Sequence, residues 1–196
     1  MVNSTTYRLY GRTKGRKKNK NNDSFLKIKL IKIDHTKYNI LDIGAGFGES
    51  TIKLAKKDKN KIVICCEKYI DGLNSLFQKA QIEQLDNIFI YQGNVHQMID
   101  EYCSKNSLSE VWILYPDPWP KKKHFKRRLI DKFFFDKIKK YLKYGGTINI
   151  ATDSKSYISQ ILRTIYEVKT DFLWANQSKS EWEYDSETLP ETKYYK

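Results

Sequence analysis

The sequence predicts an α/β fold in which helices cover both faces of a mostly parallel β-sheet. Two observations support this prediction. Short apolar runs alternate with segments of helical spacing through most of the 196 residues, and a polar or glycine-rich loop follows each run. Buried parallel strands are typically such short runs, and the helices between them make the crossovers that parallel pairing needs.

The elements follow one another in a regular order. Five apolar runs predict strands, at residues 38–43, 62–66, 88–91, 111–114 and 147–151. Helical spacing predicts helices from the glycine-rich loop to residue 55 and at 71–84, 126–142 and 157–166. Gly145 and Gly146 are expected to stop the third of these helices. The run at 25–33 suits a strand or a helix, and a last pair of strands is expected at 172–174 and 193–195.

The composition narrows the class of partner. Lys and Arg outnumber Asp and Glu by 36 to 23, a formal net charge of +13, which favours a polyanion, either nucleic acid or an anionic membrane surface. No apolar run approaches the length of a membrane span, and residues 1–20 lack the apolar centre of a signal peptide. The three cysteines show no metal-binding spacing. We expect a reduced, cytoplasmic protein without a metal.

Residues 1–22 contain many cations and no acid. They are too poor in apolar residues to pack, so a flexible basic arm is expected there, followed by a single domain at 23–196. Such arms commonly contact phosphates. A merely solubilising tail explains the composition equally well.

A glycine-rich loop lies between the first predicted strand and its helix. It contains Asp42, Gly44, Gly46 and Gly48, and glycines allow a sharp turn and a close approach to a ligand. Glu49 takes the place of the last glycine of a nicotinamide fingerprint, and its charge would meet a pyrophosphate unfavourably. A structural turn is the alternative to a binding loop.

Two polar residues follow the next strands at the same edge of the predicted sheet. Glu67 ends the second strand, where an acid can hold ribose hydroxyls. Asn94 follows the third strand and suits either the amino group of an adenine or a turn. Together with the glycine loop they suit a cofactor without phosphates, such as S-adenosyl-L-methionine.

A proline-rich loop follows the fourth strand. Prolines 116, 118 and 120 exclude a helix, so Asp117 and Trp119 are presented on a stiff loop at the ligand-binding edge. Six cations follow within residues 121–128. An acid, an aromatic ring and cations suit a nucleobase on a phosphate backbone, although a proline-rich connection with a solvated charge run is the simpler reading. Asp153 ends the fifth strand and is either a site residue or a helix N-cap.

These motifs together resemble the bacterial tRNA (guanine-N7-)-methyltransferases over nearly the whole chain. The resemblance rests on residues 10–16, 42–48, 115–128, 152–153 with Tyr157, and 192–194. It implies a Rossmann-like class I methyltransferase fold with a seven-stranded sheet. It also implies methyl transfer from S-adenosyl-L-methionine to N7 of guanosine 46 in the variable loop of tRNA, which yields 7-methylguanosine and S-adenosyl-L-homocysteine.

The resemblance assigns roles by motif position. The cofactor site would comprise Asp42, Gly44, Gly46, Gly48, Glu67, Asn94 and Asp117. The substrate would meet Lys121, Asp153, Thr192, Lys193, Tyr194 and Tyr195. RNA would be bound by Arg12, Arg16, Lys123, His124, Phe125, Lys126, Arg127 and Arg128. The family often has Asp at the position of Asn94, whose amide still accepts a hydrogen bond, and an acid at that of Tyr195.

The chemistry assigns the main catalytic role to Asp117. N7 of guanine carries a lone pair and attacks a methyl sulfonium without first losing a proton, so alignment matters more than a strong base. The methylated base is cationic, and a carboxylate such as that of Asp117 or Asp153 stabilises this charge. We expect a monomer that binds tRNA and no membrane. A methyltransferase for exocyclic amines and a non-catalytic tRNA-binding module are the alternatives.

Overall fold

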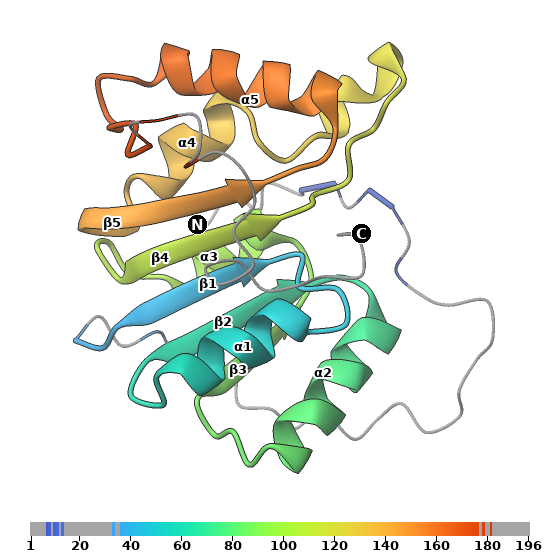
Figure 1. The fold of residues 1–196 in the computed structure, drawn as a ribbon, viewed down its shortest axis with the longest axis vertical. Helices are drawn as coiled ribbons and strands as arrows, with labels where there is room; N and C mark the ends of the chain where they lie inside the picture. The colour runs from blue at the N-terminus through green and yellow to red at the C-terminus, as the bar shows by residue number, and fades with distance from the viewer. Residues whose placement is uncertain are drawn as a thin grey trace, which may run out of the picture.

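The computed structural model describes residues 7–8, 10–11, 13, 33, 36–176, 178 and 181. Its sheet has five parallel strands in the order β3-β2-β1-β4-β5 (Figure 1). The strands are β1 Asn39–Ile43, β2 Ile62–Glu67, β3 Ile88–Gln92, β4 Leu108–Leu114 and β5 Leu142–Ala151. The helices are α1 Glu49–Lys57, α2 Ile70–Ile82, α3 Val95–Tyr102, α4 Lys132–Ile138 and α5 Lys155–Glu167, with a 3₁₀ helix, η2, at Lys122–Arg127. The predicted α/β class is confirmed, because every strand pair is parallel.

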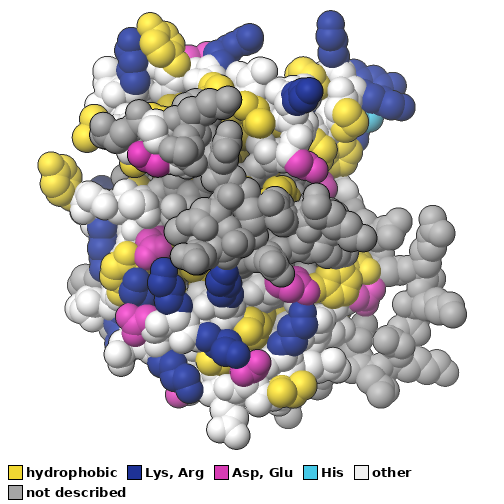
Figure 2. All heavy atoms as spheres, in the orientation of Figure 1, with side chains coloured by type: hydrophobic (Ala, Val, Ile, Leu, Met, Phe, Trp, Pro, Cys, Tyr) yellow, Lys and Arg dark blue, Asp and Glu magenta, His cyan; other side chains and the backbone are white. Residues whose placement is uncertain are grey.

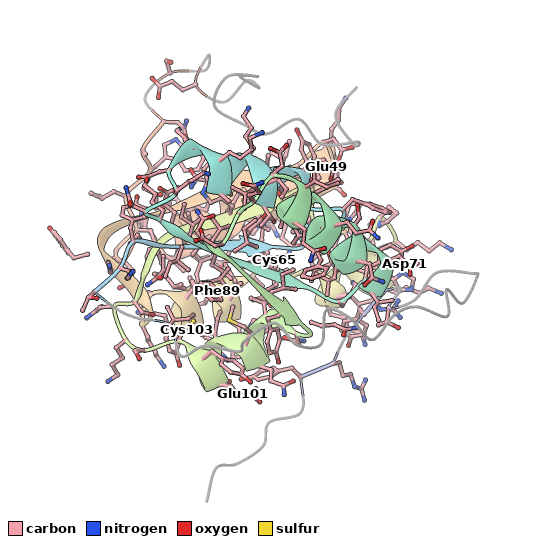
Figure 3. The ribbon with its side chains drawn as sticks, turned by 90° about the horizontal axis from the view of Figure 1, so that it is seen from below. Glu49, Cys65, Asp71, Phe89, Glu101 and Cys103 are labelled. Carbon is pink, nitrogen blue, oxygen red and sulfur yellow. The ribbon has the colours of Figure 1, made fainter. Side chains whose placement is uncertain are left out.

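The core has two layers because successive strand residues point to opposite faces of the sheet. Leu41 and Ile64 belong to the larger cluster, with side chains of α3, α4 and α5. Ile40 and Val63 pack against α1 on the other face, where Cys65 meets α2. In Figure 3, Cys65 lies toward α1 and α2, whereas Phe89 and Cys103 lie toward α3.

The three cysteines are packing residues in this fold. None of them is in a disulfide. Burial raises the pKa of the Cys65 and Cys66 thiols and raises that of Cys103 to about 12, so all three are held as neutral thiols.

The boundary between the third predicted helix and the fifth strand is corrected. Instead of one helix over 126–142, η2 ends at Arg127, and α4 begins after Asp131, whose carboxylate accepts a hydrogen bond from Phe134 N at 2.8 Å. The strand then begins at Leu142 and runs through Gly145 and Gly146. The register slips between Leu108 and Glu110, so the glycines lie at an irregularity of a strand rather than at a helix stop.

Two other elements differ from the sequence prediction. Helix α3 was not foreseen. Residues 172–174 form no strand; Phe172 packs edge-on against Phe135 of α4, with ring centroids 5.2 Å apart, and Leu173 is exposed. The described residues therefore contain five strands rather than seven, and residues 193–195 lie outside them. None of the helices in the described ranges is both long and apolar enough to cross a membrane.

Candidate functional site

The loop between β1 and α1 turns at the carboxyl edge of the sheet, where all five strands end (Figure 1). Gly44, Gly46 and Gly48 have φ of 76°, 58° and 85°, a left-handed conformation that favours glycine over any residue with a Cβ. Gly44 N donates to Cys66 O at 2.8 Å, which ties the loop to the end of β2. The predicted loop is therefore a tight turn against the neighbouring strand.

Glu67 holds this loop from the side of β2. Its Oε2 accepts a hydrogen bond from Gly46 N at 2.9 Å, and its Oε1 accepts from Lys68 N at 2.6 Å and Tyr69 N at 2.9 Å. The side chain lies beside the glycine turn, as the sequence predicted. Its contact with a ribose stays a prediction.

Asp42 supports the glycine loop from strand β1. It is 1% exposed, and its Oδ2 accepts hydrogen bonds from Ser50 Oγ at 2.7 Å and Thr51 Oγ1 at 2.6 Å. Burial raises its pKa to about 6, against the lowering effect of the two hydroxyl groups. The carboxyl group thus fastens β1 to the first turn of α1.

Asn94 is the N-cap of α3. Its Oδ1 accepts a hydrogen bond from His96 N at 2.8 Å, and its Nδ2 donates to Arg8 O at 3.4 Å. Of the two roles that the sequence left open for Asn94, the structure therefore supports that of a turn residue. A contact between Asn94 and an adenine stays a prediction.

Asp117 is linked to Glu67 through Lys68, whose backbone N donates to Glu67 Oε1 and whose side chain reaches Asp117. Lys68 Nζ is 3.4 Å from Asp117 Oδ2 and donates a hydrogen bond to Tyr10 O. The Asp117 side chain is 61% exposed. A Cβ added to Gly11 would lie 3.1 Å from Asp117 Oδ2, so part of the N-terminal segment passes beside this carboxylate. Lys68 was missed by the sequence reasoning; its position directly after the acid that ends β2 was the available signal.

The proline-rich loop carries strain and an aromatic cluster. Tyr115 and Trp119 have φ of 50° and 42°, a conformation that is costly for residues other than glycine. The Trp119 ring meets His124 edge-on, with centroids 5.8 Å apart, and Arg127 Cζ lies 4.9 Å from its centroid. Arg127 Cζ also lies 5.2 Å from the centroid of the Tyr10 ring, which itself meets the Trp119 ring edge-on, with centroids 6.3 Å apart.

Cations surround this loop on η2. Figure 2 shows Lys and Arg side chains gathered at the upper right, where η2 lies in Figure 1. The exposed members are Lys121, Lys122, Lys123 and Lys126. Desolvation and these neighbouring cations lower the pKa of His124. Arg128 differs from the others, since it is only 3% exposed.

The remaining predicted residues divide into two groups. Asp153 is exposed after β5 and is not the N-cap of α5, a place taken by Ser154. Arg12, Arg16, Thr192, Lys193, Tyr194 and Tyr195 lie outside the described residues. Within the described ranges, no three His, Cys, Asp or Glu side chains are close enough to hold a metal ion.

Comparisons with known proteins show the family to which this chain belongs. Residues 36–196 match the family described as "Putative methyltransferase". A tRNA (guanine-N(7)-)-methyltransferase of Neorickettsia sennetsu is 33% identical over 165 residues, which cover 82% of this chain and 76% of that protein. The chain belongs to the tRNA (guanine-N(7)-)-methyltransferase family.

Other members of the family are more similar over shorter stretches. Proteins of the same description from Polaromonas sp. and Buchnera aphidicola are each 41% identical, over 64% and 66% of this chain. The chain spans only 51% and 54% of their lengths.

The family's fold is also found in solved methyltransferase structures. Precorrin-6y C5,15-methyltransferase from Geobacter metallireducens has a TM-score of 0.53 at 14% identity, covering 67% of this chain and 63% of that one. A SAM-dependent O-methyltransferase from Thermotoga maritima has a TM-score of 0.51 at 20% identity, covering 67% and 44%. At these identities the likeness concerns the fold alone.

Proposed function

We propose that this chain transfers a methyl group from S-adenosyl-L-methionine to N7 of guanosine 46 in the variable loop of tRNA. The observation that carries the proposal is the meeting of the glycine loop, Glu67 and Asp117 at one edge of the sheet, with Lys68 between the two acids. In a member of this family, that edge is the natural place for a donor and an acceptor of the methyl group.

The residues at the edge suit the cofactor. A Cβ added to Gly44 or Gly46 would meet no heavy atom within 4 Å, so the loop borders open space. Glu67 supplies carboxylate oxygens for ribose hydroxyls, and Asn94 supplies an amide for a base. The cofactor would supply a methyl group on a cationic sulfur.

Asp117 would orient the guanine and balance its charge. Its exposed carboxylate is paired with Lys68 by one contact at 3.4 Å, and such an exposed pair is weak enough to yield to a ligand. As N7 gains the methyl group, positive charge develops on the ring, and a fixed carboxylate stabilises it. No group needs to remove a proton from N7.

The cations of η2 would hold the RNA. Lys123, Lys126 and Arg127 follow the catalytic loop directly, so phosphates bound there would place a nucleotide near Asp117. Trp119 offers an aromatic ring beside them for stacking.

The proposal also extends to residues and properties that are still open. Lys121, Asp153 and residues 192–195 would contact the substrate, and Arg12 and Arg16 would contact phosphates. A further strand of the sheet would come from residues 193–195. We propose a monomer that acts in the cytoplasm, where its tRNA substrate is found.

Incubation of the protein with unmodified tRNA and labelled S-adenosyl-L-methionine, followed by nucleoside analysis, tests the proposal. 7-Methylguanosine at position 46 is the expected product. A label on an exocyclic amine would replace the proposal with the alternative methyltransferase. Binding of tRNA without binding of the cofactor in calorimetry would instead indicate a non-catalytic module.

A further inference from the structure

Arg128 ends the cationic run but does not share the exposure of its neighbours. Only 3% of its surface is exposed. Its Nε donates to Pro118 O at 2.8 Å, in the proline-rich loop. Its Nη1 and Nη2 donate to α5: to Ser156 O at 3.1 Å, to Gln160 Oε1 at 2.9 Å and to Ser156 Oγ at 2.8 Å. A guanidinium with these partners joins two elements and has little left to offer a phosphate.

Aromatic rings fix the plane of this guanidinium. Arg128 Cζ lies 3.7 Å from the centroid of Phe125 and 4.8 Å from that of Tyr157. The same face of α5 holds the backbone of Ile130, whose N donates to Tyr157 Oη at 2.9 Å and whose O accepts from Gln160 Nε2 at 3.1 Å. The segment is therefore docked on α5 through side-chain planes and directional hydrogen bonds.

The hydrogen bond from Arg128 to Pro118 O acts on the strained part of the proline-rich loop. This carbonyl belongs to the peptide that joins Pro118 to Trp119, and its orientation helps to set the φ of Trp119, which is 42°. Asp117 immediately precedes Pro118. A small rotation of the loop would thus move the carboxylate relative to the glycine turn.

We propose that Arg128 is a positioning residue that locks the proline-rich loop onto α5 and so sets the place of Asp117. The inference rests on the proposed function for its kinetic consequence. Arg128 contributes through Pro118, Ser156 and Gln160 rather than through contact with RNA.

Arg128→Lys separates this role from that of an RNA contact. Lysine keeps the charge but cannot make the planar set of hydrogen bonds. We expect kcat to fall about 100-fold, the scale of a misplacement of about 1 Å, with the KM for tRNA and its dependence on salt little changed. Lys126→Ala should do the reverse, raising KM while sparing kcat. The matched control is Arg163→Lys, since Arg163 is an exposed arginine on α5. Its kcat and KM should equal those of the wild type.

Amide hydrogen exchange provides a readout that does not need activity. In Arg128→Lys, exchange should become faster in a peptide covering residues 112–120 and stay unchanged in β1 to β3. An unchanged kcat with unchanged exchange would overturn the proposal, as would a loss seen only in KM. If the wild type itself methylates no tRNA, the proposed function fails, while the exchange comparison still decides the role of Arg128.

The double variant Ser156→Ala/Gln160→Ala keeps the test decisive if Arg128→Lys does not fold. It removes both side-chain acceptors of Arg128 and leaves the arginine in place. Lower kcat and faster exchange at residues 112–120, with an unchanged cofactor dissociation constant, would support the proposal. Wild-type values for both would contradict it.

Discussion

Asp42 shows how one buried carboxyl group links loop structure to pH. Its pKa rises from 3.8 to about 6, chiefly because of burial, and also through the charge of Glu67. The folded state therefore holds the proton more tightly than the unfolded state does. The stability that Asp42 contributes is complete below pH 3.8 and is lost as the pH rises through about 6.

Asp42→Asn should remove this dependence, because asparagine does not titrate and its Oδ1 can accept the same hydroxyl hydrogen bonds. We expect the free energy of unfolding of the variant, relative to that of the wild type, to increase between pH 3.8 and about 6. Urea denaturation across this range measures it. His96, whose pKa burial lowers to about 4, contributes with the opposite sign but equally in both proteins. Parallel curves for the two proteins would contradict the assignment.

Asp117 makes a different contribution at the same scale. Its carboxylate is exposed, so Asp117→Ala should cost little stability. Turnover should fall about 10²–10³-fold, the usual loss when one preorganised electrostatic group is removed, while the tRNA dissociation constant stays close to that of the wild type. Steady-state kinetics and tRNA binding check both. Asp136→Ala, an exposed acid paired with Lys132 on α4, should leave turnover unchanged; equal losses in the two variants would point to a general charge effect.

At the scale of elements, the glycine loop depends on the helix packed behind it. Gly72 lies in the first turn of α2, and a Cβ there would come within 2.0 Å of Gly46 O. We predict that Gly72→Ala displaces the loop, lowers the free energy of unfolding by about 1–3 kcal/mol and weakens binding of S-adenosyl-L-methionine. Thermal denaturation and calorimetry measure the two effects. Gln78→Ala, at an exposed position of α2, should change neither; cofactor affinity unchanged in Gly72→Ala would show that the loop does not depend on this contact.

The elements that were predicted correctly from the sequence are those set by local pattern. A strand such as β2 is a run of apolar residues, and the turn after β1 needs glycine. The prediction that a helix ends at Gly145 was wrong because a positive φ occurs in two different structures. The φ of 74° at Gly145 suits a helix C-cap and equally an irregular strand.

Contacts between distant residues could not be predicted in this way. The burial of Arg128 depends on Ser156 and Gln160, which lie 28 and 32 residues further along the chain. Locally, Arg128 is indistinguishable from the exposed cations before it. For the same reason the bridge from Lys68 to Asp117, 49 residues apart, was not foreseen.

At the scale of the whole molecule, the net charge of +13 becomes informative through its distribution. The cations of η2 lie at the carboxyl edge of the sheet, beside the candidate site. The logarithm of the binding constant for tRNA should therefore fall linearly with the logarithm of salt concentration, because bound phosphates release counterions. The triple variant Lys122→Ala/Lys123→Ala/Lys126→Ala should lower the magnitude of this slope by about one for each lysine that contacts a phosphate.

A matched triple variant separates local contact from net charge. Lys139, Lys140 and Lys169 are exposed, and Lys139 pairs with Asp171 at 2.9 Å, which places this group where α4 and α5 end. Both helices end at the amino edge of the sheet, since α4 leads into β5 and α5 runs back from its far end. Replacing these three lysines by alanine removes the same charge but should leave the slope nearly unchanged. Equal changes of the slope in the two triple variants would mean that tRNA responds to the overall electrostatic field of the protein. They would contradict the placement of RNA on η2.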